Sequence, residues 1–157
     1  MVALLRAKNP QAVLFACAQN AVRSPMAESL LKQMFPQGLY VRSAGAKKGE
    51  LDPFAVAVMA EFGQDISGHK PQTFEELDDW EGLNFDLIIT LSPEAHHKAL
   101  DLTRTLAADV EYWPTFDATL MIGQGSREQI LQAYRTVRDA LFKRIKQRFG
   151  LEGGPSV

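Results

Sequence analysis

An apolar run, a short polar loop and a helical pattern follow one another near the start of this chain, and together they constrain its fold most strongly. The run covers residues 12–16 and is typical of a buried strand, and the loop after it begins at Cys17. Ser24 and Pro25 have the residue types of a helix N-cap and first turn. The sequence therefore predicts a strand, a loop and a helix in that order.

The predicted loop has the composition of an anion-binding site. The backbone N–H groups of residues 18–24 can turn inward, where the positive end of the following helix dipole also lies. Arg23 adds a planar guanidinium group that suits bidentate binding of an oxyanion. The same positive field favours the thiolate form of Cys17, which is the nucleophilic form. We therefore expect Cys17 to attack the phosphorus of a bound phosphoryl group.

Strand and helix patterns alternate along the rest of the chain. Further strands are predicted at residues 39–42, 85–91 and 109–113. A short helix is predicted at about residues 73–79, and further helices are predicted to begin at caps formed by Asp52, Ser92 and Ser126. The basic residues of the last of these helices, among them Arg138, are expected on its solvent-exposed side.

Alternating strands and helices imply a parallel sheet with right-handed crossovers and helices on both of its faces. In such a sheet, ligands bind beyond the carboxyl ends of the strands. Cys17, Ser43, Ser92 and Asp117 each follow a different predicted strand. We therefore expect these four side chains to gather at one edge of the sheet.

Length and composition are those of one globular domain, with 157 residues, 46% of them hydrophobic and 23% charged. A formal net charge of −2 gives no general attraction to nucleic acid or to an anionic membrane, so neither is expected as a partner. Cys17 is the only cysteine, which excludes an internal disulfide and fits a reducing compartment. Residues 1–11 lack the apolar core of a signal peptide. We expect a cytoplasmic protein that is a monomer or a weak dimer.

The loop at residues 17–24 and three later segments resemble the low-molecular-weight protein tyrosine phosphatase family. These segments are Pro-Met-Ala-Glu at 25–28, Ser-Ala-Gly at 43–45 and Asp-Ile-Ser-Gly-His at 65–69. The resemblance runs from about residue 12 to about residue 149. Thioredoxin-coupled arsenate reductases share the fold and the loop.

Pattern and resemblance together predict an α/β fold in a single domain. We expect a three-layer sandwich in which a four-stranded parallel sheet, in the order 2-1-3-4, has helices on both faces. The domain is predicted to occupy residues 1–149, and residues 150–157 are expected to form a disordered tail.

The resemblance also implies roles for individual residues. Cys17, Arg23 and Asp117 match the nucleophile, the stabilising arginine and the general acid of the family, although Ala118 stands where the family usually has proline after the acid. Ser43 and His69 match residues that support the loop through hydrogen bonds. Neither a metal nor a cofactor is expected. The remaining loop residues are expected to bind the substrate: Ala18, Gln19, Asn20, Ala21, Val22 and Ser24.

The predicted function is metal-independent hydrolysis of phosphomonoesters through a phosphocysteine intermediate, with phosphate or a phosphorylated substrate as the ligand. Members that prefer phosphotyrosine have aromatic residues where this chain has Ala118, Thr119 and residues 46–49, so no such preference is predicted. Lys47 and Lys48 either favour an acidic ligand or are ordinary surface lysines.

Two alternatives stay open. One is an arsenate reductase that uses an external thiol, because the thioredoxin-coupled mechanism needs two further cysteines that this chain lacks. The other is a catalytically weak oxyanion-binding module, for which Ala118 after the expected acid is the only support.

Overall fold

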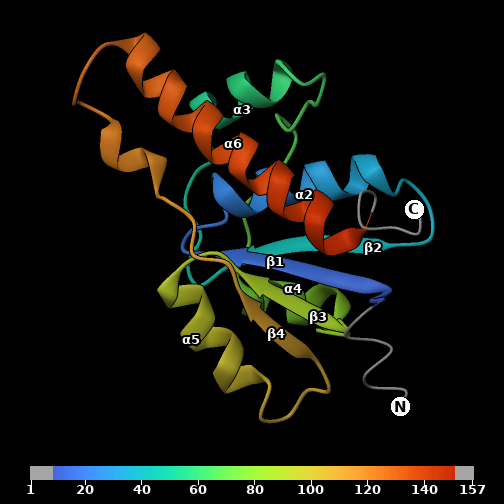
Figure 1. Cartoon of the computed structure of the whole chain (residues 1–157). Helices are drawn as coiled ribbons and strands as arrows, with labels where there is room; N and C mark the ends of the chain where they lie inside the picture. Colours follow the sequence, from blue (N-terminus) through green and yellow to red (C-terminus); the bar gives the residue numbers. More distant parts are fainter. Residues whose placement is uncertain (1–8, 151–157) are drawn as a thin grey trace.

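The computed structural model describes residues 9–150, which form a four-stranded parallel sheet between two layers of helices (Figure 1). The predicted fold class is confirmed, including the strand order β2-β1-β3-β4. The predicted tail, apart from Gly150, lies outside the described residues. The strands are β1 (Ala12–Cys17), β2 (Tyr40–Gly45), β3 (Leu87–Thr90) and β4 (Asp109–Tyr112).

Helices cover both faces of the sheet (Figure 1). On one face lie α2 (Arg23–Met34), α3 (Pro53–Ala60) and α6 (Arg127–Phe149), and on the other lie α4 (Phe74–Glu81) and α5 (Pro93–Leu102). A short 3₁₀ helix, η1 (Ala118–Met121), separates β4 from α6 and was not predicted. Among the described residues, no helix combines the length and apolarity needed to span a membrane.

The central strand β1 is buried on both sides, which explains why its sequence is continuously apolar. Val13 and Phe15 belong to the hydrophobic cluster under α2 and α6. Leu14 and Ala16 belong to the second cluster, under α4 and α5. The two clusters hold β1 in place, and its last residue, Cys17, is thereby fixed at the carboxyl edge of the sheet.

The predicted helix caps are confirmed at three of the four positions. Asp52 accepts a hydrogen bond from Phe54 N, Ser92 accepts one from Ala95 N, and Ser126 forms a capping box. The short helix predicted at about residues 73–79 is α4, and Thr73 caps it with a second capping box.

The prediction that Ser24 caps α2 is wrong. The N-cap is Val22, which makes no side-chain cap bond, and Ser24 lies within the first turn. The Ser24 hydroxyl is instead engaged by Cys17 and Asn20, so it is not available to the backbone of its own helix.

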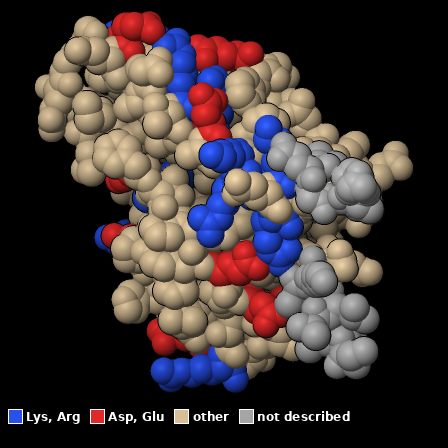
Figure 2. Space-filling model, viewed as in Figure 1, with Lys and Arg blue, Asp and Glu red and all other residues tan. Residues whose placement is uncertain are grey.

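Lysine and arginine side chains gather along α6 on the face seen in Figure 2. Arg135 and Arg138 both pair with Glu61, at 2.9 and 2.7 Å. Arg138 is only 6% exposed, so the prediction that it faces solvent is wrong. The guanidinium of Arg144 lies over the ring of Trp113, with its Cζ 4.9 Å from the ring centroid. These contacts fasten α6 to the rest of the domain.

Candidate active site

In the loop between β1 and α2, several carbonyl groups are engaged by other segments, while the N–H groups have no protein acceptor among the described residues. The N–H groups of residues 46, 47 and 49 donate to the carbonyls of residues 17, 18 and 19, at 2.9 to 3.0 Å. Within residues 9–150, the backbone N–H groups of residues 18–22 donate to no protein acceptor. Such a run of free N–H groups is an anion-binding concavity.

Asn20 holds the loop from the inside. Its φ of 55° is left-handed, a conformation that asparagine tolerates. Its buried side chain donates to the hydroxyls of Ser24 (2.8 Å) and Ser43 (2.9 Å). Its amide oxygen accepts from Gln72 N at 2.9 Å and lies 3.0 Å from Nε2 of His69. The structure thus brings the predicted residues Asn20, Ser24, Ser43 and His69 into one network.

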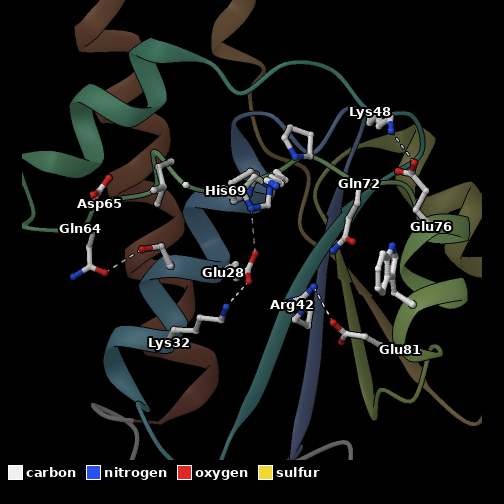
Figure 3. A pocket seen from close by; sticks show the side chains of 17 residues that line it. Glu28, Lys32, Arg42, Lys48, Gln64, Asp65, His69, Gln72, Glu76 and Glu81 are labelled. Carbon is white, nitrogen blue, oxygen red and sulfur yellow. Dashed lines mark hydrogen bonds and ion pairs between the residues drawn. The ribbon is translucent and has the colours of Figure 1, made fainter.

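Glu28 belongs to this network; the sequence analysis included it in a segment of the family resemblance but gave it no role. The Ser43 hydroxyl donates to Glu28 at 2.5 Å, and Lys32 pairs with the same carboxylate at 2.6 Å. His69 Nδ1 lies 3.9 Å from it (Figure 3). Glu28 lies one turn after Ser24 on the same helix face, and that spacing was the available signal.

The imidazole of His69 lies beside a cavity of about 790 Å³ between α2 and α4 (Figure 3). Burial lowers the pKa of His69 below its ordinary value of 6.5, and the charge of Glu28 opposes this only in part. The neutral form of the ring is therefore the form that the fold accommodates.

Gly45 ends β2 where another residue type would collide with the loop. A Cβ atom there would lie 2.8 Å from Asn20 N and 2.9 Å from the carbonyl carbon of Gln19. The absence of a side chain lets the strand end approach the loop closely. This explains the glycine of the Ser-Ala-Gly segment.

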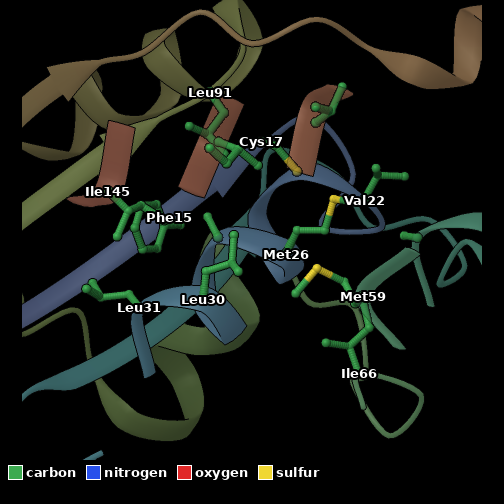
Figure 4. Packing of buried hydrophobic residues seen from close by; sticks show 14 of the residues in the cluster. Phe15, Cys17, Val22, Met26, Leu30, Leu31, Met59, Ile66, Leu91 and Ile145 are labelled. Carbon is green, nitrogen blue, oxygen red and sulfur yellow. The ribbon is translucent and has the colours of Figure 1, made fainter. Parts of the chain in front are cut away.

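Cys17 lies at the boundary between the hydrophobic core and a cavity. Its side chain packs among Val22, Met26 and Leu91 and is only 2% exposed (Figure 4). Its Sγ lies 2.9 Å from the Ser24 hydroxyl, and the residue lines a cavity of about 340 Å³. A hydroxyl in that position can donate to a thiolate.

Arg23 and Asp117 line the same cavity as Cys17. Arg23 is buried and donates from Nη1 to the carbonyl of Thr115 at 2.9 Å, which connects the loop to the segment after β4. Asp117 accepts from both the backbone N–H and the hydroxyl of Thr119, at 3.0 and 2.6 Å. Asp117 is thus both the cap of η1 and a wall of the cavity.

Asp52 and Tyr134 form a second support that sequence reasoning missed. The Tyr134 hydroxyl donates to Asp52 at 2.6 Å, and Asp52 N donates to the carbonyl of Ala21 at 3.2 Å. Burial raises the pKa of Tyr134 above its ordinary value, and the hydrogen bond and charge of Asp52 raise it further. Tyr134 is therefore a permanent donor that ties α6 and α3 to the loop.

Lys47 and Lys48 do not line the cavity of Cys17. Lys48 pairs instead with Glu76 at 2.7 Å (Figure 3). Of the two interpretations of these lysines, the structure favours ordinary surface residues.

The parallel sheet, the cysteine that ends its first strand and the loop of free N–H groups define a phosphatase-like α/β class. The sequence profile described as low molecular weight phosphotyrosine protein phosphatase matches residues 12–149, so the chain belongs to that family.

The proteins that are similar to this chain carry the names of two activities, arsenate reduction and tyrosine phosphatase activity. An arsenate reductase of Bacillus subtilis (strain 168) is 33% identical over 135 residues, which cover 86% of this chain and 92% of that protein. A probable low molecular weight protein-tyrosine-phosphatase, EpsP of Ralstonia solanacearum, is 51% identical over 63 residues. These residues cover 38% of this chain and 43% of that protein. The crystal structure of the Erwinia amylovora tyrosine phosphatase amsI covers 88% of this chain and 90% of its own, with a TM-score of 0.67; its 22% identity shows the fold alone.

Proposed function

We propose that this protein is a metal-independent phosphomonoester hydrolase that works through a phosphocysteine intermediate. One observation carries the proposal: a single cavity is lined by Cys17, Arg23, Asp117 and loop residues whose N–H groups have no acceptor among the described residues. Membership of the phosphatase family supports phosphorylated substrates.

In the first step, the Cys17 thiolate attacks phosphorus in line with the leaving oxygen. The S–P bond forms as the P–O bond breaks, and Asp117 gives its proton to the leaving alkoxide or phenoxide. The loop N–H groups and the Arg23 guanidinium stabilise the charge on the equatorial oxygens of the transition state.

In the second step, the Asp117 carboxylate takes a proton from water as the water oxygen attacks phosphorus. The S–P bond breaks, inorganic phosphate forms and the thiolate leaves. The Ser24 hydroxyl, 2.9 Å from Sγ, donates to the departing thiolate and makes it a better leaving group.

Hydrolysis of para-nitrophenyl phosphate by the wild type and by Cys17→Ser tests the proposal. We expect turnover by the wild type and a loss of at least about 10⁴-fold in the variant. Undiminished turnover by Cys17→Ser would contradict the assignment of the nucleophile. Tight binding of phosphate with no turnover of any phosphomonoester would favour an oxyanion-binding module instead.

Arsenate reduction is a second candidate, favoured by the 33% identity to the Bacillus subtilis arsenate reductase. Cys17 is the only cysteine, so an external thiol would have to attack the sulfur of a Cys17–arsenic adduct. That attack would release arsenite and leave a mixed disulfide, which a second external thiol would reduce. Arsenite production that depends on added thiol, with negligible phosphatase activity, would establish this function in place of hydrolysis.

A further inference from the structure

The cavity that contains Cys17 is lined by more negative than positive side chains. Among the described residues that line it, the one cation is Arg23, and the carboxylates belong to Glu50, Asp52 and Asp117. A phosphoryl group brings further negative charge into this space. The part of a substrate that extends beyond the phosphoryl group therefore meets an acidic rim.

Glu50 differs from the other two carboxylates because no residue between positions 9 and 150 bonds to it or pairs with it. Asp52 accepts from Tyr134 and Asp117 accepts from Thr119. Glu50 is exposed, and it has no hydrogen bond or ion pair in the part of the chain that the structure describes. Its charge is therefore available to a ligand.

The nearby lysines do not cancel this charge. Lys47 and Lys48 are absent from the lining of the cavity, and Lys48 pairs with Glu76 beside the other cavity (Figure 3). Ile122, which is 50% exposed, gives the same rim an apolar wall, whereas the Phe54 ring is already covered by Tyr134 and by the guanidinium of Arg127. An apolar wall next to a free carboxylate suits a long basic side chain, which packs its stem and pairs its charged end.

We propose that Glu50 selects substrates that carry a positive charge beside the phosphoryl group, namely phosphopeptides with lysine or arginine next to the phosphorylated residue. This inference rests on the proposed hydrolase function. The Glu50 carboxylate attracts a basic residue beside the phosphorylated residue of the peptide and repels an acidic one, and this difference produces the selectivity.

Two phosphotyrosine peptides that differ only in lysine or glutamate at the flanking positions test the proposal. Each is used as a competitor of para-nitrophenyl phosphate hydrolysis, so an inhibition constant is obtained whether or not the peptide is cleaved. We expect the wild type to bind the lysine peptide at least about fivefold more tightly at low salt. Raised ionic strength should reduce this ratio.

In Glu50→Gln the ratio of the two inhibition constants should fall towards one, and in Glu50→Lys it should reverse. The ratio does not depend on the fraction of active enzyme, so a variant that folds poorly still gives an answer. Asp79→Asn is the matched control, because it removes an exposed carboxylate from α4 on the other face of the sheet (Figure 1) and should leave the ratio unchanged.

Equal inhibition by both peptides in the wild type, no inhibition by either, or an unchanged ratio in Glu50→Gln would overturn the role of Glu50. Each of these results is compatible with hydrolysis of para-nitrophenyl phosphate that depends on Cys17. Loss of that hydrolysis in the wild type would instead overturn the proposed function itself.

Discussion

The loop at residues 17–24 and the segment at residues 114–124 both line one cavity, but they are held in different ways. In the loop, Asn20 and Ser24 are fully buried and their side chains are joined by hydrogen bonds. In the segment after β4, Phe116 is 54% exposed and Leu120 is 61% exposed.

This difference corresponds to two parts of the proposed reaction, binding of the phosphoryl oxygens and protonation of the leaving group. The loop contains the groups that would meet the phosphoryl oxygens, which are the same in every substrate, and the fold fixes those groups from several sides. The other segment contains Asp117, which would meet the leaving group, and it is held less completely: Ala118 is buried and Thr115 accepts from Arg23, but Phe116 and Leu120 are exposed. Changes in the loop should therefore affect every substrate and stability together, whereas a change at Asp117 that keeps the cap of η1 should depend on the substrate and affect stability less.

The largest effect is expected for Arg23→Lys. Lysine cannot reproduce the planar fork that matches two phosphoryl oxygens, so kcat should fall about 10³-fold for aryl and alkyl phosphates alike. Steady-state kinetics on both substrate types would measure this. A loss confined to one leaving group would break the distinction between the two regions.

The next effect is expected for Asp117→Asn. An amide cannot supply the proton that a poor leaving group needs, so kcat/KM on an alkyl phosphate should fall about 10²-fold or more. Para-nitrophenyl phosphate has a good leaving group, so its kcat/KM should be affected less. Equal losses of kcat/KM on both substrates would show that Asp117 is not the general acid.

A smaller effect is expected for Asn20→Ala, and it should be seen in stability. The change removes the acceptor of the Gln72 N–H and one of the two partners of each buried hydroxyl, those of Ser24 and Ser43. The free energy of unfolding should fall by about 2 kcal/mol or more in urea titrations. Gln124→Ala, at an exposed position in the other segment, is the control and should stay within about 0.5 kcal/mol of the wild type.

The smallest effect concerns pH and His69. Burial lowers the pKa of His69, so below about pH 6.5 the unfolded chain takes up a proton more readily than the folded one. The free energy of unfolding should therefore fall as the pH falls through this range, and His69→Gln should reduce that dependence. Urea titrations of both proteins at a series of pH values would test this, and identical pH profiles would contradict it.

The fold was predictable because its signals are local. Apolar runs mark the strands, and the caps at Asp52, Ser92 and Ser126 mark helix starts within a few residues. The gathering of Cys17 and later residues at one edge follows from the topology of a parallel sheet.

The supporting contacts were not predictable, because they join residues that are distant in the sequence. Tyr134 and Asp52 are 82 residues apart, and nothing local marks either one as a partner of the other. The Ser24 hydroxyl had two possible partners, its own helix or the Cys17 thiol, and only the folded loop decides between them. The exposure of Arg138 was predicted wrongly for the same reason, because its partner Glu61 lies at the C-terminal end of α3, far away in the sequence.

The central claim is that the sulfur of Cys17 becomes bonded to phosphorus during turnover. Rapid quenching of the Asp117→Asn variant in denaturant during para-nitrophenyl phosphate hydrolysis, followed by peptide mass spectrometry, measures this directly, because loss of the base slows breakdown of the intermediate. We expect a single phosphoryl group on the peptide that contains Cys17. Turnover with no such adduct, or with the adduct on another residue, would contradict the account.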